Sequence, residues 1–287
     1  MKRYHDIPGD GGSDVAGQVA AQQARLRRRL DEVRHVLAVV SGKGGVGKST
    51  VSASLACAFA VDGWRTGVLD ADLNGPSIAK MLGVRGRRLS VAGDAVEPPT
   101  SPLGVKVMSM DLLLGADDAP LTWQAPTQAD AHTWRGAMEA QALREFVADT
   151  AWGHLDVLVV DLPPGTDRLA TVASLLPGIA GAVILTIPSD VSHLVVRKSI
   201  TVARQVGVPI LGLVENMAGL FPGPDAAAVA AESGIPFLGR VPFDRGLALA
   251  ADRGDPYVAT EPASPASRAL REIAAGLRAA LERRAAC

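Results

Sequence analysis

The stretch from Gly42 to Thr50 constrains the fold of this 287-residue chain more than any other part of it. It reads GKGGVGKST, follows the apolar run Val36–Val40 after the single residue Ser41, and leads into a helical pattern that starts at Val51. This sequence matches the pattern G-x-x-x-x-G-K-[ST] in the strand, loop and helix context that the pattern requires. Glycines let a backbone wrap around phosphate groups, while the N–H groups at the start of a helix point at the anion. The sequence therefore predicts a phosphate-binding loop, with a chance glycine-rich turn as the alternative.

Two side chains of this loop have expected roles. Lys48 is expected to neutralise the β- and γ-phosphates of a nucleotide. Ser49 is expected to give its hydroxyl to Mg²⁺, whose octahedral shell is completed by phosphate oxygens and water. The predicted nucleotide-binding residues of the loop are Gly42, Lys43, Gly44, Gly45, Val46, Gly47, Lys48, Ser49 and Thr50.

Seven short apolar runs alternate with longer helical stretches along the chain. The runs contain little polar alternation, which is typical of strands that are buried on both faces of a parallel sheet. The expected fold class is therefore α/β, with a doubly wound, mainly parallel sheet flanked by helices. The expected strands are Val36–Val40, Thr66–Asp70, Val105–Ser109, Val157–Asp161, Ala182–Thr186, Ile210–Val214 and Phe237–Val241.

Three parts are expected along the chain. Residues 1–14 are polar and glycine-rich, and we expect them to form a flexible tail. Apolar positions recur at mostly helical spacing over residues 15–34, which predicts an N-terminal helix. Its basic run Arg27–Arg29 is interpreted as a solvated face, with contact to nucleic acid as the alternative. Residues 35–287 are expected to form one domain.

Two segments inside this domain are expected to lie outside the main sheet. The segment Gly83–Pro102 is rich in Gly, Arg and Pro, which predicts a small hairpin or lid. The segment Gly115–Thr133 is polar and contains two prolines, so an irregular surface loop is expected there.

Composition excludes several classes of protein. Hydrophobic residues make up 48% of the chain and charged residues 21%, so disorder is excluded as its main state. The 29 basic and 30 acidic residues give a net charge of −1, and no global field draws the chain onto nucleic acid or anionic lipid. Two cysteines form no disulfide framework, and we see neither a leader pattern nor an apolar stretch of membrane-spanning length. These features predict a cytoplasmic protein.

The lysine at position 43 gives the loop a family resemblance. The segment KGGVGKS is similar to the deviant phosphate loop of the SIMIBI-class ATPases, which include MinD, ParA, the nitrogenase iron protein and the Mrp/ApbC proteins. The resemblance implies that ATP binds between the subunits of a homodimer, where Lys43 reaches the phosphates held by the other subunit. A lysine that is merely solvated on the loop is the alternative.

Two further segments resemble the Mrp/ApbC proteins in particular. The run DADLNGPS begins at Asp70, and the run WRGAM spans residues 134–138, with Ala137 where proline is usual. The resemblance gives Asp72 the catalytic role of positioning the water that attacks the γ-phosphate. Asp70 is expected to serve Mg²⁺ or the hydrogen bonds of its loop, and a plain strand-end cap is the alternative for either aspartate. The run 134–138 is interpreted as structural support for the site.

The last residue of the strand expected at Val157–Asp161 is also an aspartate. Ligands of open α/β sheets bind at the carboxyl ends of the strands, so Asp161 is placed to hold Mg²⁺ through a water. The following run, Pro163–Thr166, resembles the nucleotide-sensing switch of the family. The family usually continues with Gly-Asp, whereas this chain has Asp167 and Arg168.

The nucleotide base is expected to lie near Asn216 and Pro242. Both assignments rest mainly on the resemblance of the runs ENM and VPFD to segments of the family. An asparagine amide offers a donor and an acceptor side by side, which suits recognition of a base. The chain lacks the N-K-x-D pattern of guanine sites, which favours ATP over GTP.

The resemblance fails at the cysteines. Typical Mrp/ApbC proteins carry a Cys-x-x-Cys soon after the ENM run, where two subunits hold a 4Fe–4S cluster between them. Residues 217–225 of this chain contain no cysteine. Four thiolates are what such a cluster needs. We expect Cys57 to be a buried structural cysteine and Cys287 to be no ligand, so the cluster that the family implies lacks its ligands here.

The C-terminal residues predict an amphipathic helix. Leu270, Ile273, Leu277 and Leu281 recur at helical spacing from about Ser264 onward, with arginines around them. Packing on the domain is expected because the preceding Ser-Pro-Ala resembles the Mrp segment. Membrane binding of the kind seen in MinD is the alternative.

The resulting hypothesis is a homodimeric, Mg²⁺-dependent ATPase of the Mrp/ApbC type that is slow without a partner. Lys43, Lys48 and Asp72 are its expected catalytic residues, and Ser49 and Asp161 its expected Mg²⁺ ligands. The expected cellular role is iron–sulfur cluster assembly or transfer, with an iron–sulfur client or a cysteine-bearing partner. The alternatives are a MinD/ParA-like positioning switch that binds membrane or DNA, and a nucleotide-gated adaptor.

Overall fold

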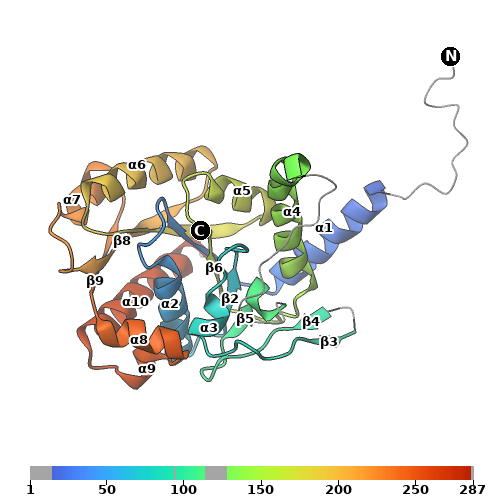
Figure 1. The fold of residues 1–287 in the computed structure, drawn as a ribbon, viewed down its shortest axis with the longest axis horizontal. Helices are drawn as coiled ribbons and strands as arrows, with labels where there is room; N and C mark the ends of the chain where they lie inside the picture. Colours follow the sequence, from blue (N-terminus) through green and yellow to red (C-terminus); the bar gives the residue numbers. More distant parts are fainter. Residues whose placement is uncertain (1–14, 94, 114–127, 286–287) are drawn as a thin grey trace, which may run out of the picture.

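A parallel sheet of seven strands forms the centre of the molecule in the computed structural model (Figure 1), which describes residues 15–93, 95–113 and 128–285. The strand order is β5-β2-β6-β1-β7-β8-β9, and every neighbouring pair is parallel. The strands are β1 (Val36–Ser41), β2 (Thr66–Asp70), β5 (Lys106–Met108), β6 (Val157–Asp161), β7 (Ile179–Thr186), β8 (Ile210–Ala218) and β9 (Phe237–Pro242). All seven expected strands are present, and the expected fold class is confirmed.

Helices cover both faces of the sheet. Alternate residues of β1 point to opposite faces, so that Leu37 and Val39 join one buried cluster while Val36, Ala38 and Val40 join another. The helices on the first face include α2 (Lys48–Val61), α3 (Ile78–Met81), α8 (Arg245–Arg253), α9 (Tyr257–Thr260) and α10 (Pro265–Ala285). The opposite face carries α1 (Val15–Asp31), α4 (Gln128–Asp149), α5 (Arg168–Leu175), α6 (Asp190–Gln205) and α7 (Ala226–Glu232).

The strand order reverses beside β1. The connection from β1 leads through α2 to β2 on one side, while β7, β8 and β9 extend the sheet on the other side. Open α/β sheets bind ligands at such a switch point, outside the carboxyl ends of the strands. The register places Asp161 of β6 beside both Val39 of β1 and Asp70 of β2, so two strand-end carboxylates are neighbours at this edge.

The two segments expected outside the sheet have different outcomes. Strands β3 (Ser90–Ala92) and β4 (Ala95–Glu97) form an antiparallel pair within Gly83–Pro102, which confirms the expected hairpin. The expectation of an irregular loop over Gly115–Thr133 is wrong for its last residues, because α4 begins at Gln128. Pro126 stands before Gln128 in the sequence, and a proline ahead of a helix does not exclude that helix. The other residues of that segment lie outside the described ranges.

The C-terminal helix α10 packs on the domain. The side chains of Leu270, Ile273, Leu277 and Leu281 are at most 1% exposed and belong to the same buried cluster as residues of α2 and the sheet. The expected amphipathic helix is therefore confirmed, and its apolar face is covered by this chain itself. Within the described ranges, no helix is both long and apolar enough to cross a membrane.

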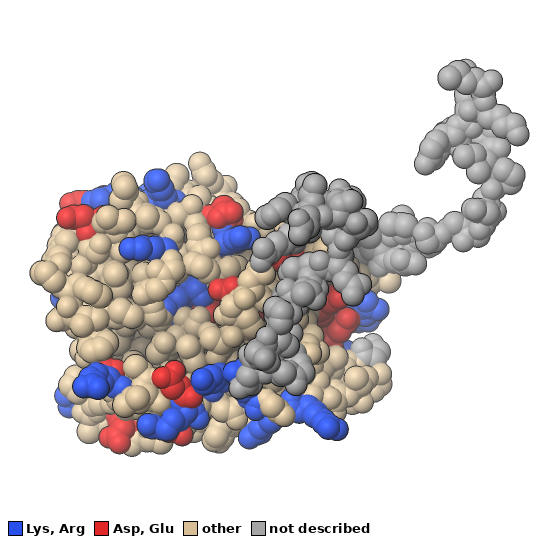
Figure 2. All heavy atoms as spheres, in the orientation of Figure 1, with Lys and Arg blue, Asp and Glu red and all other residues tan. Residues whose placement is uncertain are grey.

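Figure 2 shows basic and acidic side chains interspersed over the described part of one face. This distribution agrees with the net charge of −1 for the whole chain. Arginines also make ion pairs across elements, such as that of Arg65 with Asp156 and that of Arg271 with Asp62.

Candidate nucleotide site

The glycine-rich loop lies between β1 and α2, as its sequence pattern predicts. Gly45 and Gly47 have φ values of 78° and 76°, a left-handed conformation that other residues rarely adopt. A Cβ atom at Gly42 would clash with Cγ1 of Val195 on α6. Glycine is therefore required in this loop both for its turns and for the close approach of α6.

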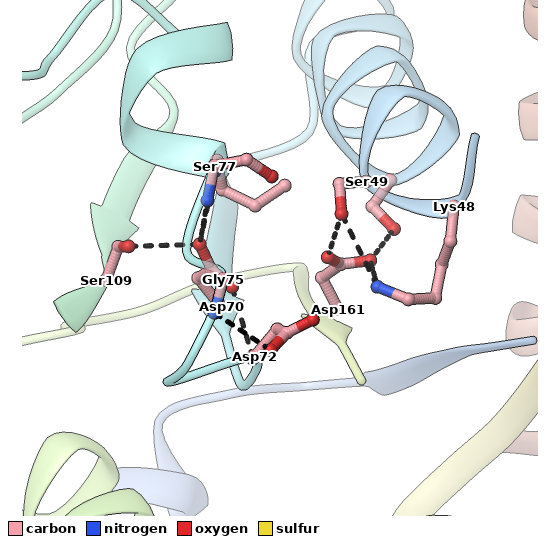
Figure 3. Close-up of polar contacts among 10 residues, drawn as sticks. Lys48, Ser49, Asp70, Asp72, Gly75, Ser77, Ser109 and Asp161 are labelled. Carbon is pink, nitrogen blue, oxygen red and sulfur yellow. Dashed lines mark hydrogen bonds and ion pairs between the residues drawn. The ribbon is translucent and has the colours of Figure 1, made fainter. Parts of the chain in front are cut away.

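Three side chains of α2 converge on Asp161 at the end of β6 (Figure 3). The Nζ atom of Lys48 lies 2.7 Å from Oδ1 of Asp161. Ser49 donates its hydroxyl to Oδ2 at 2.7 Å, and Ser52 donates its hydroxyl to Oδ1 at 2.6 Å. The sequence predicted that Lys48, Ser49 and Asp161 serve one site, and the structure brings them together. Ser52, one helical turn beyond Lys48, was not predicted.

The burial of this cluster strengthens its interactions. Lys48 is 6% exposed and Asp161 is fully buried. A buried carboxylate is tolerated only where charge and hydrogen bonds compensate for its lost hydration, and Asp161 has one ammonium and two hydroxyl donors. The cluster therefore concentrates charged groups at the end of the central strands, directly beside the glycine-rich loop.

The donor set at Asp161 fits Mg²⁺. This ion binds oxygen ligands such as a carboxylate and a hydroxyl, and it usually retains several waters. The hydroxyl of Ser49 and the carboxylate of Asp161 already meet at hydrogen-bond distance, so both oxygens face the same point.

Asp70 organises the loop that follows β2. Its Oδ2 accepts hydrogen bonds from the backbone N–H groups of Ser77 and Ile78 at 3.0 and 3.1 Å and from the hydroxyl of Ser109 at 3.0 Å (Figure 3). Its Oδ1 accepts from the N–H of Asp72 at 3.2 Å. Burial and the nearby charge of Asp161 raise the pKa of Asp70 to about 7. Two roles were expected for Asp70, in Mg²⁺ binding or in the hydrogen bonds of its loop. These contacts correspond to the second role.

Asp72 lies at the turn that Asp70 holds in place. Its side chain is half-buried, and its Oδ1 accepts the N–H of Gly75 at 3.2 Å. The carboxylate thus has a fixed backbone partner but remains partly open to solvent. Figure 3 shows Asp72 in the loop after Asp70, the residue of β2 that is paired with Asp161 in the sheet.

Lys43 stands apart from this cluster. Its side chain is exposed, and it forms no hydrogen bond or ion pair with any residue in the described ranges. The structure therefore does not bring Lys43 to the Asp161 cluster of its own chain.

Asn216 and Pro242 line one hollow beside the loop. The other lining residues include Gly47, Thr50 and Phe243. Asn216 is 6% exposed, and its Nδ2 donates to the carbonyl oxygen of Val46 at 2.9 Å. The amide N–H therefore holds the glycine-rich loop, a contact that the sequence pattern did not indicate.

A carboxylate on α4 connects the loops that follow β2 and β6. Asn74 donates its amide to Oε1 of Glu139 at 2.8 Å, and Arg168 at the start of α5 lies 3.5 Å from Oε2. Glu139 directly follows the run 134–138, which lies within α4. Glu139 was not predicted as a site residue, because no pattern in the sequence indicates which glutamate of α4 faces these loops.

The run Pro163–Thr166, which follows β6, contacts both the end of β1 and the glycine-rich loop. The N–H of Gly165 donates to the carbonyl oxygen of Ser41 at 3.1 Å. Pro164 lies next to Gly44, at 3.9 Å from the position of a Cβ atom there. The two segments are therefore in direct contact.

The described part of the chain contains one cysteine, Cys57 on α2. It is buried, as expected, and burial raises the pKa of its thiol to about 12. Among the described residues, no group of three or more His, Cys, Asp or Glu side chains is arranged to hold a metal ion. Cys287 lies outside the described residues. Within the described ranges, a single buried thiol does not supply the four thiolates that a 4Fe–4S cluster needs.

Fold and site together define a P-loop protein whose phosphate loop lies at the switch point of a parallel sheet. A family model described as "ParA: NUBPL iron-transfer P-loop NTPase" matches residues 32–278. The chain belongs to this family, which confirms the expected Mrp/ApbC-type membership.

Curated relatives and solved structures agree with this assignment. The chain is 42% identical over 272 residues to the iron–sulfur cluster carrier protein of Saccharolobus solfataricus, covering 91% of this chain and 88% of the relative. It is 39% identical over 257 residues to the protein of that name from Methanocaldococcus jannaschii, covering 85% of both. Both relatives are thus named as carriers of iron–sulfur clusters, the role that the family resemblance implies.

A nucleotide-binding protein from Archaeoglobus fulgidus, solved in complex with ADP, is 36% identical and has a TM-score of 0.68, covering 81% of this chain and 91% of that one. The MinD cell division ATPase of Pyrococcus furiosus is 22% identical with a TM-score of 0.63, covering 85% of this chain and 98% of that one. The second likeness shows a shared fold.

Proposed function

We propose that this chain binds ATP at the loop Gly42–Thr50 and hydrolyses it to ADP and phosphate. The observation that carries the proposal is the convergence of Lys48, Ser49 and Asp161 beside that loop. The ADP complex of the Archaeoglobus fulgidus protein supports the same class of ligand here.

Each residue of the site has a separate proposed role in phosphoryl transfer. Ser49 and Asp161 would hold Mg²⁺, which when bound neutralises charge on the phosphate oxygens. Lys48 supplies a positive charge to the β- and γ-phosphates. Asp72 orients the attacking water and accepts its proton as the bond from the γ-phosphorus to the bridging oxygen breaks. This chemistry requires positioning and charge stabilisation more than covalent catalysis.

The nucleotide is proposed to lie between two copies of the chain. Lys43 is exposed at the loop without a partner in the described part of its own chain, which suits a role at the phosphates of the other subunit. The base is proposed to occupy the hollow lined by Asn216 and Pro242. Because the N–H of Asn216 holds Val46, its amide oxygen is the atom available to an amino group of the base.

Hydrolysis is tested with Lys48→Ala against the matched control Lys198→Ala, an exposed lysine on α6. We expect phosphate release from ATP to fall to background in Lys48→Ala and to persist in Lys198→Ala. Equal steady-state rates in both variants would contradict the assignment. Tight ATP binding without any phosphate release by the wild-type protein would favour the nucleotide-gated adaptor instead.

The ATPase cycle is proposed to act in cytoplasmic iron–sulfur cluster assembly or transfer, with the cluster ligands supplied by a client or partner protein. Two findings support this division: the relatives are named as carriers, and the described residues of this chain offer no ligand set. Anaerobic reconstitution with iron and sulfide tests it. We expect no cluster above background in the wild-type protein or in Cys287→Ser. A stoichiometric cluster that is lost in Cys287→Ser would show that this chain carries its own cargo.

A further inference from the structure

Helices α1, α4 and α5 cover one face of the sheet (Figure 1). A cavity of about 230 Å³ is lined by residues of these helices and of the segment just after α5. Its polar lining residues are Gln22, Gln23, Arg27, Arg144 and Ser174, and its apolar lining residues are Leu26, Leu175 and Pro177. None of these lining residues belongs to the glycine-rich loop, the Asp161 cluster or the hollow beside Asn216. The cavity is therefore separate from the proposed nucleotide site.

Two guanidinium groups face this cavity without an acidic partner. Neither Arg27 on α1 nor Arg144 on α4 forms an ion pair with any residue in the described ranges. The neighbouring acids of α4 have other partners: Glu145 accepts the amide of Gln141 at 2.8 Å, and Asp149 pairs with Arg25 at 3.6 Å. Arg27 is exposed and Arg144 is half-buried, and both line one cavity, so an anion bound there would meet two positive charges that no acidic side chain of the described residues neutralises.

The remaining lining defines what kind of anion fits. Guanidinium groups bind carboxylate and phosphate oxygens in a fork geometry, and the amides of Gln22 and Gln23 add neutral donors. Leu26 and Leu175 are buried side chains that give the cavity an apolar wall. The volume is several times the roughly 30 Å³ that one water takes up in the liquid. A bare inorganic ion would fill little of this space, whereas a small organic molecule has a carbon skeleton for the apolar wall.

From these observations we propose that the cavity lined by residues of α1, α4 and α5 is a binding site for a small organic polyanion. Its carboxylate or phosphate groups contact Arg27 and Arg144, and its carbon skeleton lies against Leu26 and Leu175. This site shares no residue with the proposed nucleotide site, so the proposal can be tested separately from the proposed ATPase activity.

Isothermal titration calorimetry of the full chain with citrate and with glycerol 3-phosphate tests the site and distinguishes carboxylate from phosphate ligands. We expect at least one of them to bind saturably with a Kd of about 1 mM or tighter, and inorganic phosphate to bind more weakly. Arg27→Gln and Arg144→Gln are each expected to raise that Kd about tenfold, because each removes a charge-assisted contact. Arg28→Gln, an exposed neighbour on α1 that does not line the cavity, is the matched control and should leave the Kd unchanged.

A second control separates this cavity from the phosphate loop. Binding at the cavity persists in Lys48→Ala, whereas an anion in the phosphate loop would lose its affinity there. The proposal is overturned if neither organic anion binds saturably, if Arg28→Gln weakens binding as much as Arg27→Gln, or if Lys48→Ala abolishes it.

Discussion

The ammonium of Lys48 lies 2.7 Å from the carboxylate of Asp161, and both side chains are almost wholly buried. Removal of one partner of such a pair leaves an uncompensated buried charge. We therefore expect Lys48→Met to lower the free energy of unfolding of the nucleotide-free protein by about 3 kcal/mol. In this variant the hydroxyls of Ser49 and Ser52 still donate hydrogen bonds to Asp161, which limits the decrease in the free energy of unfolding. Urea denaturation measures it, and an unchanged midpoint would show that the pair contributes no stability.

Asp70 makes stability depend on pH. Its pKa is raised to about 7, so the folded state binds its proton more tightly than the unfolded chain does. The stabilising contribution is therefore complete below the ordinary aspartate pKa of about 4 and is lost as the pH rises through about 7. We expect the free energy of unfolding of the wild-type protein to decrease as the pH rises from 5.5 to 8.5, because Asp70 loses its proton in this range. In Asp70→Asn this decrease should be absent. An equal pH dependence in both proteins, measured by urea denaturation, would refute the role of Asp70.

Glu139 links the loop that carries Asp72 to the start of α5. Because Asn74 and Arg168 share its carboxylate, we expect Glu139→Ala to lower the rate of ATP hydrolysis roughly tenfold through misplacement of the loop, with ATP affinity unchanged. Glu139→Gln keeps an acceptor for Asn74 and should lose less activity. Glu145→Gln, on the same helix, is the control that should behave as the wild type. A rise in KM at constant kcat would indicate instead that Glu139 acts on nucleotide binding.

The covered face of α10 predicts how the chain behaves with lipid. Its apolar residues, including Leu270 and Leu277, lie in the core and are not available to a bilayer. We expect no ATP-dependent sedimentation with vesicles that contain anionic lipid. Sedimentation that requires ATP and is lost in Lys48→Ala would instead support the MinD-like alternative.

The phosphate loop, the seven strands and Asp161 could be predicted because each depends on local pattern. Short apolar runs specify buried strands, and a strand-end carboxylate must lie at the same edge of the sheet as the loop after β1. The shared fold therefore follows from residues that are close in sequence. The same reasoning predicted the apolar face of α10 from the helical spacing of its leucine and isoleucine residues, and the structure confirms it.

Contacts between distant segments could not be predicted in this way. The hydrogen bond from Asn216 to Val46 joins residues 170 positions apart, and that from Asn74 to Glu139 joins residues 65 positions apart. Which polar side chain faces which loop depends on helix rotation and register, which no local pattern specifies. The start of α4 at Gln128 was missed for a related reason, since a polar stretch near prolines resembles a loop until its partner helix α1 is known.

If Asp72 acts on the water that attacks the γ-phosphate, its loss must slow the chemical step itself. Phosphate formation by the wild-type protein and by Asp72→Ala is therefore compared in a single turnover of ATP with Mg²⁺ present, alongside equilibrium binding of ATP to both. We expect Asp72→Ala to bind ATP with unchanged affinity and to form phosphate at least about a hundredfold more slowly, as happens when a general base is lost. An equal rate of phosphate formation in the two proteins would show that Asp72 has no such role.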